Sequence, residues 1–278
     1  MRFIYATDLH GNITLYNKLL GKAIEENIEH ILIGGDLLPK KIRFLDEAII
    51  VQNKYSNFLA DLFQNYKKTN PDKNIYLIFG NDDLKATYPI LKKAHEDGTI
   101  HLLNEGVCKI KSNPEEINLA GYSYVSPTPF RLKDWEKGDI KRFKSDYYND
   151  AVRSVPLTKE CINTIAEDLE NIVHLSDPAR TIYLFHDPPY DTNLDVLGDG
   201  THTGSKAIRK FIEKKKPLLT LHGHIHESYD MSGSYSDKIN KTLALNPGST
   251  SGFYKKEGIL NALIVDTDDL ENILFMKI

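Results

Sequence analysis

Short apolar runs alternate with longer amphipathic stretches along most of the chain. Five runs are dominated by apolar residues and have the length of buried strands: residues 2–7, 30–33, 74–79, 181–185 and 218–221. Four longer stretches are predicted to be helices: residues 13–24, 45–66, 158–173 and 205–215. This alternation of strand and helix patterns predicts an α/β fold.

Two of the predicted helices have a clear apolar side that we expect to face the core. In the first helix these residues are Ile13, Tyr16, Leu20 and Ile24. In the longest helix they are Ala48, Val51, Tyr55, Phe58, Leu62 and Tyr66. The aromatic members are interpreted as core residues rather than as a binding surface.

The remaining patterns predict shorter elements and one irregular segment. Further strands are expected at residues 100–103, 107–110, 117–122, 242–245, 259–266 and 273–278. A short helix is expected from Pro89, which suits a helix start, to Gly98, which suits its end. Residues 123–155 show no regular period. We therefore predict a single domain, residues 1–278, with a surface excursion or lid at about residues 123–155.

Each of the five buried strands is followed by a side chain that can bind a metal ion. These side chains are Asp8, His10, Asp36, Asn81, His186, His224 and His226. In an α/β sheet the carboxyl ends of the strands share one edge, where ligands usually bind. The seven side chains are therefore expected to converge on one site.

The ligand types indicate which ions the site would hold. The seven side chains offer oxygen and nitrogen but no sulfur, which suits divalent transition metals. Seven ligands are too many for one tetrahedral zinc ion, so two ions that share a carboxylate fit better. Asp36, which follows two glycines, is the expected bridge. Manganese is the first choice, with iron, nickel, zinc or cobalt as alternatives.

Composition narrows the possible partners and the compartment. The net charge of −4 and the pI of about 6.2 argue against a nucleic-acid-binding surface. The basic cluster of Lys40, Lys41 and Arg43 is interpreted as a solvated face. No apolar run reaches the roughly 18 residues of a membrane-spanning helix. The two cysteines lack metal or redox spacing, which indicates a reducing, cytoplasmic location. A homodimer is considered, although no sequence feature supports it.

The motif set resembles that of the calcineurin-like metallophosphoesterase superfamily. The matching motifs are Asp8-x-His10, Gly34-Gly35-Asp36, Gly80-Asn81-Asp82-Asp83, His186 and Gly223-His224-x-His226. The order is that of the family, and the run from His186 to His224 is similar to small, one-domain microbial members. The resemblance implies a four-layer α/β/β/α sandwich of two mixed sheets flanked by helices.

The same resemblance implies how two metal ions would be held. It implies one ion bound by Asp8, His10, Asp36 and His226. It implies a second ion bound by Asp36, Asn81, His186 and His224. Two cations at such a site can lower the pKa of a bridging water and hold phosphate oxygens during in-line attack by the hydroxide.

The third motif departs from the family pattern, which usually reads Gly-Asn-His followed by Glu or Asp. Asp82 stands in the place of that histidine, which in the family helps to protonate the leaving group or to hold the phosphate. An ordinary aspartate has a pKa of about 3.9, and nearby cations should lower it, so Asp82 is expected to be a poor acid. Its charge is expected to disfavour dianionic phosphomonoesters more than monoanionic phosphodiesters.

His202 is the candidate for the missing histidine. It lies in the glycine-rich segment 197–204, which links two ligand-bearing segments. The near-neutral pKa of a histidine suits proton transfer or contact with a phosphate. A solvated loop histidine is the alternative interpretation.

The sequence therefore predicts a metal-dependent phosphohydrolase. The favoured activity is a phosphodiesterase on nucleotide-like or other small phosphodiesters. A nuclease of the same superfamily is one alternative, which the acidic balance disfavours. A scaffold protein that has lost turnover is another, and Asp82 is the one feature that favours it.

Overall fold

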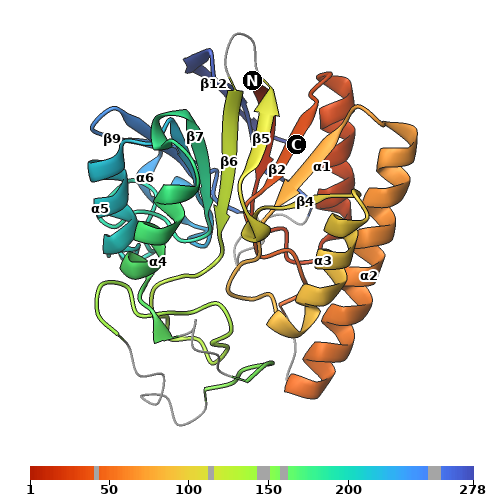
Figure 1. Cartoon of the computed structure of the whole chain (residues 1–278), viewed down its shortest axis with the longest axis horizontal. Helices are drawn as coiled ribbons and strands as arrows, with labels where there is room; N and C mark the ends of the chain where they lie inside the picture. Colours follow the sequence, from red (N-terminus) through yellow and green to blue (C-terminus); the bar gives the residue numbers. More distant parts are fainter. Residues whose placement is uncertain (41–43, 112–115, 143–150, 157–161, 250–257) are drawn as a thin grey trace.

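In the computed structural model of the protein, the described residues are 1–40, 44–111, 116–142, 151–156, 162–249 and 258–278. Figure 1 shows two sheets side by side, with helices on the outer face of each. Among the described residues, none of the helices combines the length and the apolar character that crossing a bilayer requires.

The first sheet is built around the N-terminal strand and has the order β12-β11-β1-β2-β3-β4. Its strands are β1 (Arg2–Ala6), β2 (His30–Ile33), β3 (Asn74–Leu77), β4 (His101–Leu102), β11 (Asn261–Asp266) and β12 (Asp269–Lys277). Strands β1 to β4 are parallel, whereas β11 and β12 are antiparallel to their neighbours. The sheet is therefore mixed.

The second sheet has the order β5-β6-β7-β8-β10-β9. Its strands are β5 (Cys108–Lys111), β6 (Glu116–Tyr122), β7 (Thr181–Phe185), β8 (Leu219–Leu221), β9 (Ser236–Ile239) and β10 (Thr242–Leu245). The central four strands are parallel and the two edge strands are antiparallel. The sequence pattern did not predict β9, and β12 begins four residues before the predicted strand.

The alternation of side chains along the strands creates separate cores. Phe3 and Tyr5 on β1 face the second sheet and pack in one cluster with aliphatic residues of its strands, such as Leu184. The neighbouring residues Ile4 and Ala6 point the other way, toward the outer helices. Two sheets packed face to face, each covered by helices, form the predicted four-layer α/β/β/α sandwich, so the fold class is confirmed.

Helices cover the outer faces of both sheets (Figure 1). They are α1 (Ile13–Glu25), α2 (Leu45–Thr69), α3 (Tyr88–Glu96), α4 (Ile165–Ile172) and α5 (Lys206–Lys215), and a five-residue helix, α6 (Ser228–Ser232), follows the turn at His226. Helix α4 begins at Ile165, because Thr164 and Glu167 form a capping box there. The predicted start at residue 158 lies outside the described residues, and the helix is shorter than the pattern indicated.

The core-facing side of α2 matches the prediction only in part: Ala48 is buried, and Tyr55, Leu62 and Tyr66 pack against the core. Its buried residues are Ala48, Gln52, Ser56, Leu59 and Phe63. Val51 and Phe58 are exposed, and so is Ile24 of α1. The prediction was wrong for Val51 and Phe58, because two polar residues, Gln52 and Ser56, lie on the side of α2 that faces the protein.

The irregular segment at residues 123–155 lies at the end of the sandwich where the parallel strands finish (Figure 1). Residues 143–150 are outside the described part. Several of its described residues are buried, including Val125 and Trp135. Lys133 is also buried, and its Nζ lies 2.7 Å from Oε2 of Glu136. Part of this segment is therefore packed into the protein, and its role as a lid stays a prediction.

Candidate metal centre

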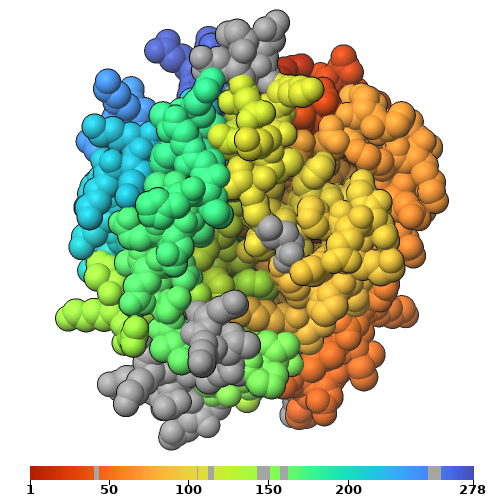
Figure 2. Space-filling model, viewed as in Figure 1, coloured from red at the N-terminus to blue at the C-terminus, as the bar shows by residue number. Residues whose placement is uncertain are grey.

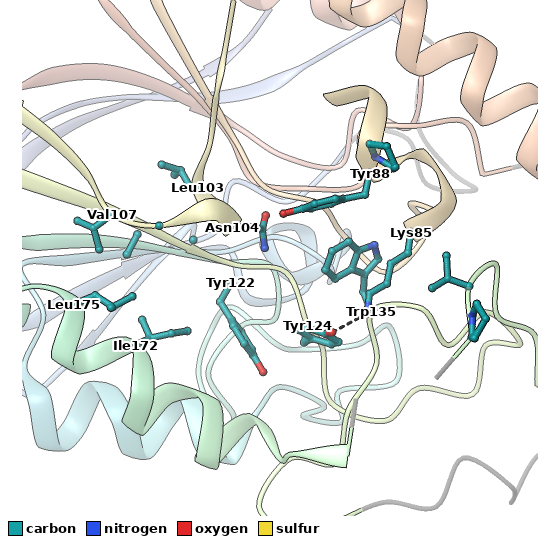
Figure 3. Close-up of a pocket in the computed structure, with 16 residues that line it drawn as sticks. Lys85, Tyr88, Leu103, Asn104, Val107, Tyr122, Tyr124, Trp135, Ile172 and Leu175 are labelled. Carbon is teal, nitrogen blue, oxygen red and sulfur yellow. Dashed lines mark hydrogen bonds between the residues drawn. The ribbon is translucent and has the colours of Figure 1, made fainter. Parts of the chain in front are cut away.

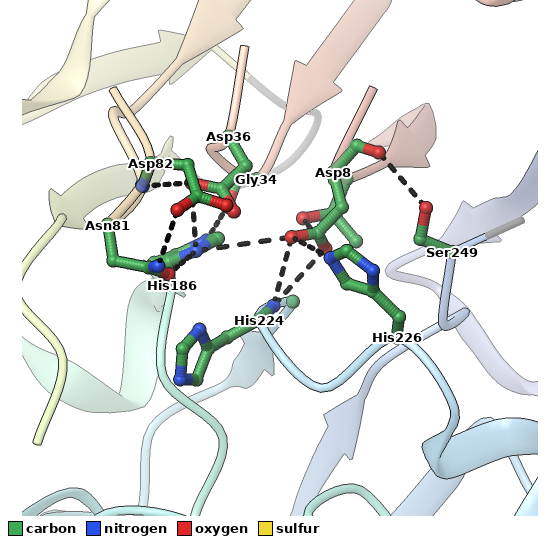
Figure 4. Close-up of polar contacts among 12 residues, drawn as sticks. Asp8, Gly34, Asp36, Asn81, Asp82, His186, His224, His226 and Ser249 are labelled. Atoms are coloured by element: carbon green, nitrogen blue, oxygen red, sulfur yellow. Dashed lines mark hydrogen bonds and ion pairs between the residues drawn. The ribbon is translucent and has the colours of Figure 1, made fainter. Parts of the chain in front are cut away.

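Four of the predicted ligands converge at the carboxyl ends of strands from both sheets, and Figure 4 labels three of them, Asp8, Asp36 and His226. Asp8, His10, Asp36 and His226 each offer one atom, and these atoms lie within 4.8 Å of one another. Nε2 of His226 lies 3.1 Å from Nε2 of His10 and 3.3 Å from Oδ1 of Asp8. Nε2 of His10 lies 3.6 Å from Oδ2 of Asp36. Two imidazole nitrogens and two carboxylates around one point form a donor set that fits a divalent transition metal.

A second group of predicted ligands gathers around the other oxygen of Asp36. Nε2 of His186 lies 3.5 Å from Oδ1 of Asp36 and 3.1 Å from Oδ1 of Asn81. Asp36 therefore directs Oδ2 toward His10 and Oδ1 toward His186. This is the arrangement expected of a carboxylate that two ions share, and the buried Asp/His cluster fits a dimetal site. The assignment of each ligand stays a prediction.

His224 differs from the other predicted ligands in how it contacts the cluster. Its backbone N–H donates to the Asp8 carboxylate, at 3.3 Å from Oδ1 and 3.2 Å from Oδ2. Its ring lies 5.4 Å from the ring of His186, between centroids, and points away from Asp8 in Figure 4. Burial lowers the pKa of His224 to about 3. The ring is therefore neutral at neutral pH, the form that binds a metal ion.

The backbone at the cluster adopts conformations that most residues avoid. Eight non-glycine residues in the described part have a positive φ, and four of them are predicted ligands. These four are Asp8 (56°), His10 (44°), Asp36 (49°) and His224 (66°). Left-handed conformations cost free energy and persist where the surrounding structure enforces them, often at functional sites. The sharp turns after the strands are thus part of how the site is built.

Two glycines let neighbouring segments approach the ligands closely. A Cβ atom at Gly80 would lie 2.2 Å from Oδ1 of Asp36 and 2.6 Å from Nε2 of His186. A Cβ atom at Gly223 would lie 2.1 Å from Oγ1 of Thr7 and 2.7 Å from Oδ2 of Asp8. Each separation is shorter than a side chain can tolerate, so the site requires glycine at both positions.

Hydrogen bonds outside the cluster orient the ligands. Nδ1 of His186 donates to the carbonyl oxygen of Gly34 at 2.8 Å, so Nε2 is the ring nitrogen that faces the cluster. Oδ2 of Asp8 accepts from Oγ1 of Thr7 at 2.8 Å. Oδ1 of Asp36 accepts from the backbone N–H of Asp82 at 2.8 Å. These contacts fix the ligand atoms before any ion binds.

The electrostatics of the cluster favour positive charge at its centre. Burial favours the protonated form of Asp36, but His186 and His10 hold its pKa well below the ordinary value. Burial also favours neutral His186, yet Asp36 and Asp8 raise the pKa of this histidine to about 10. The carboxylates of Asp36 and Asp8 thus remain ionised and attract a cation to the point between them.

Asp82 lies at the edge of this cluster. Its Oδ2 is 3.9 Å from Nδ1 of His10 and 2.7 Å from Nζ of Lys40. Burial and the charge of Asp36 raise the pKa of Asp82 to about 6, although Lys40 opposes this change. The expected lowering of this pKa concerned bound metal cations, so it stays a prediction; among the protein groups, burial outweighs the ammonium group of Lys40. Burial of this side chain could not be inferred from the sequence pattern.

His202 is held within its own loop. Its Nδ1 lies 2.7 Å from Oδ1 of the buried Asp195, and its Nε2 lies 3.9 Å from Oδ1 of Asp191. The hydrogen bond to Asp195 raises the pKa of His202. The contacts described for His202 involve the loop around it and none of the predicted ligands. Its part in the chemistry therefore stays a prediction.

A separate cavity of about 470 Å³ lies beside β6, between α3 and the end of α4 (Figure 3). In the space-filling view, the atoms of α4 lie on one side of this face and those of α3 on the other (Figure 2). Tyr122, Tyr124 and Trp135 line the cavity, together with Lys85. None of the predicted metal ligands is among its lining residues. Tyr124 and Trp135 of the irregular segment thus line this cavity and not the cluster.

Sequence reasoning missed two residues beside the cluster. Lys40 was interpreted as part of a solvated basic cluster, yet its ammonium group contacts Asp82. Gln52 was not singled out, although it is 2% exposed and hydrogen-bonds to the loop that carries Asp82. A glutamine in the middle of a predicted amphipathic helix was the available signal. Lys41 and Arg43 lie outside the described residues.

Comparisons with known proteins identify similar folds and one family. A family model described as calcineurin-like phosphoesterase matches residues 1–228. The crystal structure of TT1561 of Thermus thermophilus has 16% sequence identity and a TM-score of 0.62, with 99% of this chain and 98% of that chain covered. A dimetal phosphatase from Danio rerio has 10% identity and a TM-score of 0.54, with 100% of this chain and 95% of that chain covered. Likeness at these identities shows the fold alone. No curated protein matches the chain.

Proposed function

Since the chain belongs to the calcineurin-like phosphoesterase family, we propose that it is a phosphodiesterase that acts on small, nucleotide-like or other phosphodiesters. Family membership and the buried Asp/His cluster make the protein a metal-dependent phosphoesterase. The preference for diesters over monoesters and the identity of the metal are the parts that we propose. Oxygen and nitrogen ligands without sulfur suit manganese, iron, nickel or zinc, and manganese is the metal that we propose.

The proposed ligand sets follow the two groups of side chains around Asp36. One ion would be held by Asp8, His10, Asp36 and His226. The other would be held by Asp36, Asn81, His186 and His224. When bound, such ions supply positive charge for the phosphate oxygens and lower the pKa of a nearby water.

The residues of the chain contribute by preparing the site. The Asp36 carboxylate is held by the backbone N–H of Asp82, so it keeps its orientation between the two groups. His186 is held by the carbonyl of Gly34. Asp8, Asp36 and His186 are each at most 1% exposed, so water is largely excluded around them. A fixed, dry set of ligands avoids reorganisation when charge develops on a phosphate.

The observation that carries the preference for diesters is the position of Asp82. Its carboxylate lies 3.9 Å from His10, so it adds negative charge beside the expected phosphate site. A phosphomonoester dianion carries one more negative charge than a phosphodiester and is repelled more strongly. Even at about 12 Å and an effective dielectric constant of about 20, one unit charge contributes ~1.4 kcal/mol, or about tenfold in rate. Lys40 pairs with the Asp82 carboxylate and acts on the phosphate in the opposite direction, so about tenfold is the upper limit of the effect.

The experiment that tests this proposal is the substitution Asp82→His. We would measure kcat/KM for bis(p-nitrophenyl) phosphate and for p-nitrophenyl phosphate, which share a leaving group. The ratio of diester to monoester rates is expected to fall by up to about tenfold in Asp82→His. Asp97→His, at an exposed position on the far end of α3, should leave the ratio unchanged. An unchanged or higher ratio in Asp82→His would contradict the proposed preference.

A further inference from the structure

Lys40 holds its ammonium group against the edge of the predicted metal centre. Its Nζ lies 2.7 Å from Oδ2 of Asp82, and the side chains are 46% and 11% exposed, respectively. The ion pair therefore has one side toward solvent and one toward the protein. Burial lowers the pKa of Lys40, but Asp82, Asp36 and Asp8 raise it above its ordinary value. The ammonium group is thus a cation whose field reaches the carboxylates of the cluster.

The loops that carry Lys40 and Asp82 are joined by Gln52 of α2. Its Nε2 donates to the carbonyl oxygen of Pro39 at 3.1 Å and to that of Asp82 at 2.9 Å. Its Oε1 accepts from the backbone N–H of Leu84 at 2.8 Å. The buried Gln52 amide therefore fixes the distance between Pro39, which precedes Lys40, and Asp82, which pairs with Lys40.

Asp83 joins the same two loops a second time. Its carboxylate accepts from the backbone N–H groups of Leu37 and Leu38, at 3.1 Å and 2.8 Å. It also accepts from the backbone N–H of Gly80 at 2.9 Å. The side chain is fully buried, so these three hydrogen bonds are shielded from water. The Lys40–Asp82 pair thus rests on two loops with a fixed relative position.

A third contact restricts where the ammonium group can lie. Nζ of Lys40 is 5.1 Å from the centroid of the Phe130 ring, within the range of a cation–π interaction. Phe130 is 44% exposed, so its ring lies at the surface beside the pair. The ion pair with Asp82, the hydrogen-bonded loops that carry the pair and the Phe130 ring together restrict the position of the Lys40 ammonium group.

We propose that Lys40 contacts the phosphate group of the bound substrate and that Asp82 positions Lys40 for this contact. This inference rests on the proposed phosphoesterase function. An ammonium group has three N–H donors, so one can serve Asp82 while another serves a phosphate oxygen. Asp82 stands where the family usually has a histidine, and Lys40 supplies positive charge at that place. The contact involves no proton transfer, since Lys40 stays charged throughout.

Binding of inorganic phosphate to the Mn²⁺-loaded protein tests the contact directly. Calorimetry should show about tenfold weaker binding by Lys40→Ala, the low end for a hydrogen bond between charged groups. Lys40→Arg, which keeps the charge, should stay within about threefold of the wild type. Lys93→Ala removes an exposed lysine that pairs with Asp97 and serves as the matched control, with unchanged affinity.

The role of Asp82 is tested by combining substitutions. Asp82→Asn should strengthen phosphate binding in the Lys40→Ala background, because it removes an unpaired negative charge. In the protein that keeps Lys40, Asp82→Asn also removes the partner that positions the ammonium group. The gain in phosphate affinity should therefore be at least about threefold smaller than in the Lys40→Ala background. Equal effects of Asp82→Asn in the two backgrounds would show that Asp82 does not position Lys40.

Three further outcomes separate this proposal from the proposed function. Unchanged phosphate affinity in Lys40→Ala, with a wild type that hydrolyses phosphate esters, would overturn the role of Lys40 and leave the function intact. Loss of bound manganese from Lys40→Ala, measured by elemental analysis, would assign Lys40 to metal retention and also overturn the proposal. A wild type that binds phosphate but hydrolyses no ester would contradict the function alone.

Discussion

Replacing Gly80 by alanine should damage the metal centre while leaving the fold intact. The new Cβ atom would lie 2.2 Å from Oδ1 of Asp36, 2.4 Å from the backbone nitrogen of Asp36 and 2.6 Å from Nε2 of His186. Relief of these contacts requires a shift of roughly 1 Å, whereas metal–ligand distances vary by only about 0.2 Å. The overpacking itself should cost about 1–3 kcal/mol of stability.

The expected result is a large effect on metal binding and a small one on folding. Mn²⁺ affinity should fall at least about 100-fold, since substitutions that only touch a ligand's neighbour already cost about 10–100-fold. The melting temperature should fall by roughly 2–12 °C, from about 2–4 °C for each kcal/mol in a chain of this size. Calorimetric titration with Mn²⁺ and thermal unfolding followed by circular dichroism measure the two effects.

The matched control is Gly21→Ala. Gly21 lies inside α1, and a Cβ atom there would meet nothing within 4 Å. Alanine is a better helix former than glycine, so this variant should gain about 0.5–1 kcal/mol and bind manganese like the wild type. Gly80→Ala with two bound ions of unchanged affinity would refute the reasoning about close approach at the site.

Three further predictions concern the core, the metal and His202. Phe63→Ala removes a fully buried side chain of α2 and should cost about 3–5 kcal/mol in urea unfolding. Chelation of the metal should lower the melting temperature, because ligand at about 100 times its dissociation constant adds ~2.7 kcal/mol per site; an unchanged value would argue against tight binding. The hydrogen bond to Asp195 raises the pKa of His202. The stability that this bond adds to the folded protein is therefore complete below about pH 6.5 and is lost as the pH rises through the pKa of His202 in the folded state. An NMR titration of the His202 ring should give a pKa above 6.5 in the wild type and a lower pKa in Asp195→Asn. Equal pKa values in the two proteins would contradict this prediction.

The strands were the most predictable part of the fold. The limits of β2, β7 and β10 match the predicted ranges 30–33, 181–185 and 242–245. Each is a short apolar run that ends where polar residues or glycine begin. Both faces of each strand are covered, so the apolar run in the sequence has the same limits as the buried strand. The convergence of predicted ligands also followed from the shared edge of parallel strands. Four of them were found within 4.8 Å of one another.

The residues that support the site could not be predicted in the same way. Gln52 lies on the buried side of α2 because it hydrogen-bonds to two loops that are distant in the sequence. Lys40 appeared to be one of several surface cations, and its pairing with Asp82 depends on how those loops fold. Such contacts depend on tertiary structure, so neither period nor composition reveals them.

The most direct test of the account is hydrolysis of bis(p-nitrophenyl) phosphate by chelator-stripped protein titrated with Mn²⁺. The account predicts negligible turnover without metal and a rise that saturates when two manganese ions are bound per chain. Elemental analysis of the same samples gives the number of bound ions. Full metal uptake without turnover of this diester would contradict the central claim, and so would turnover that does not depend on added metal.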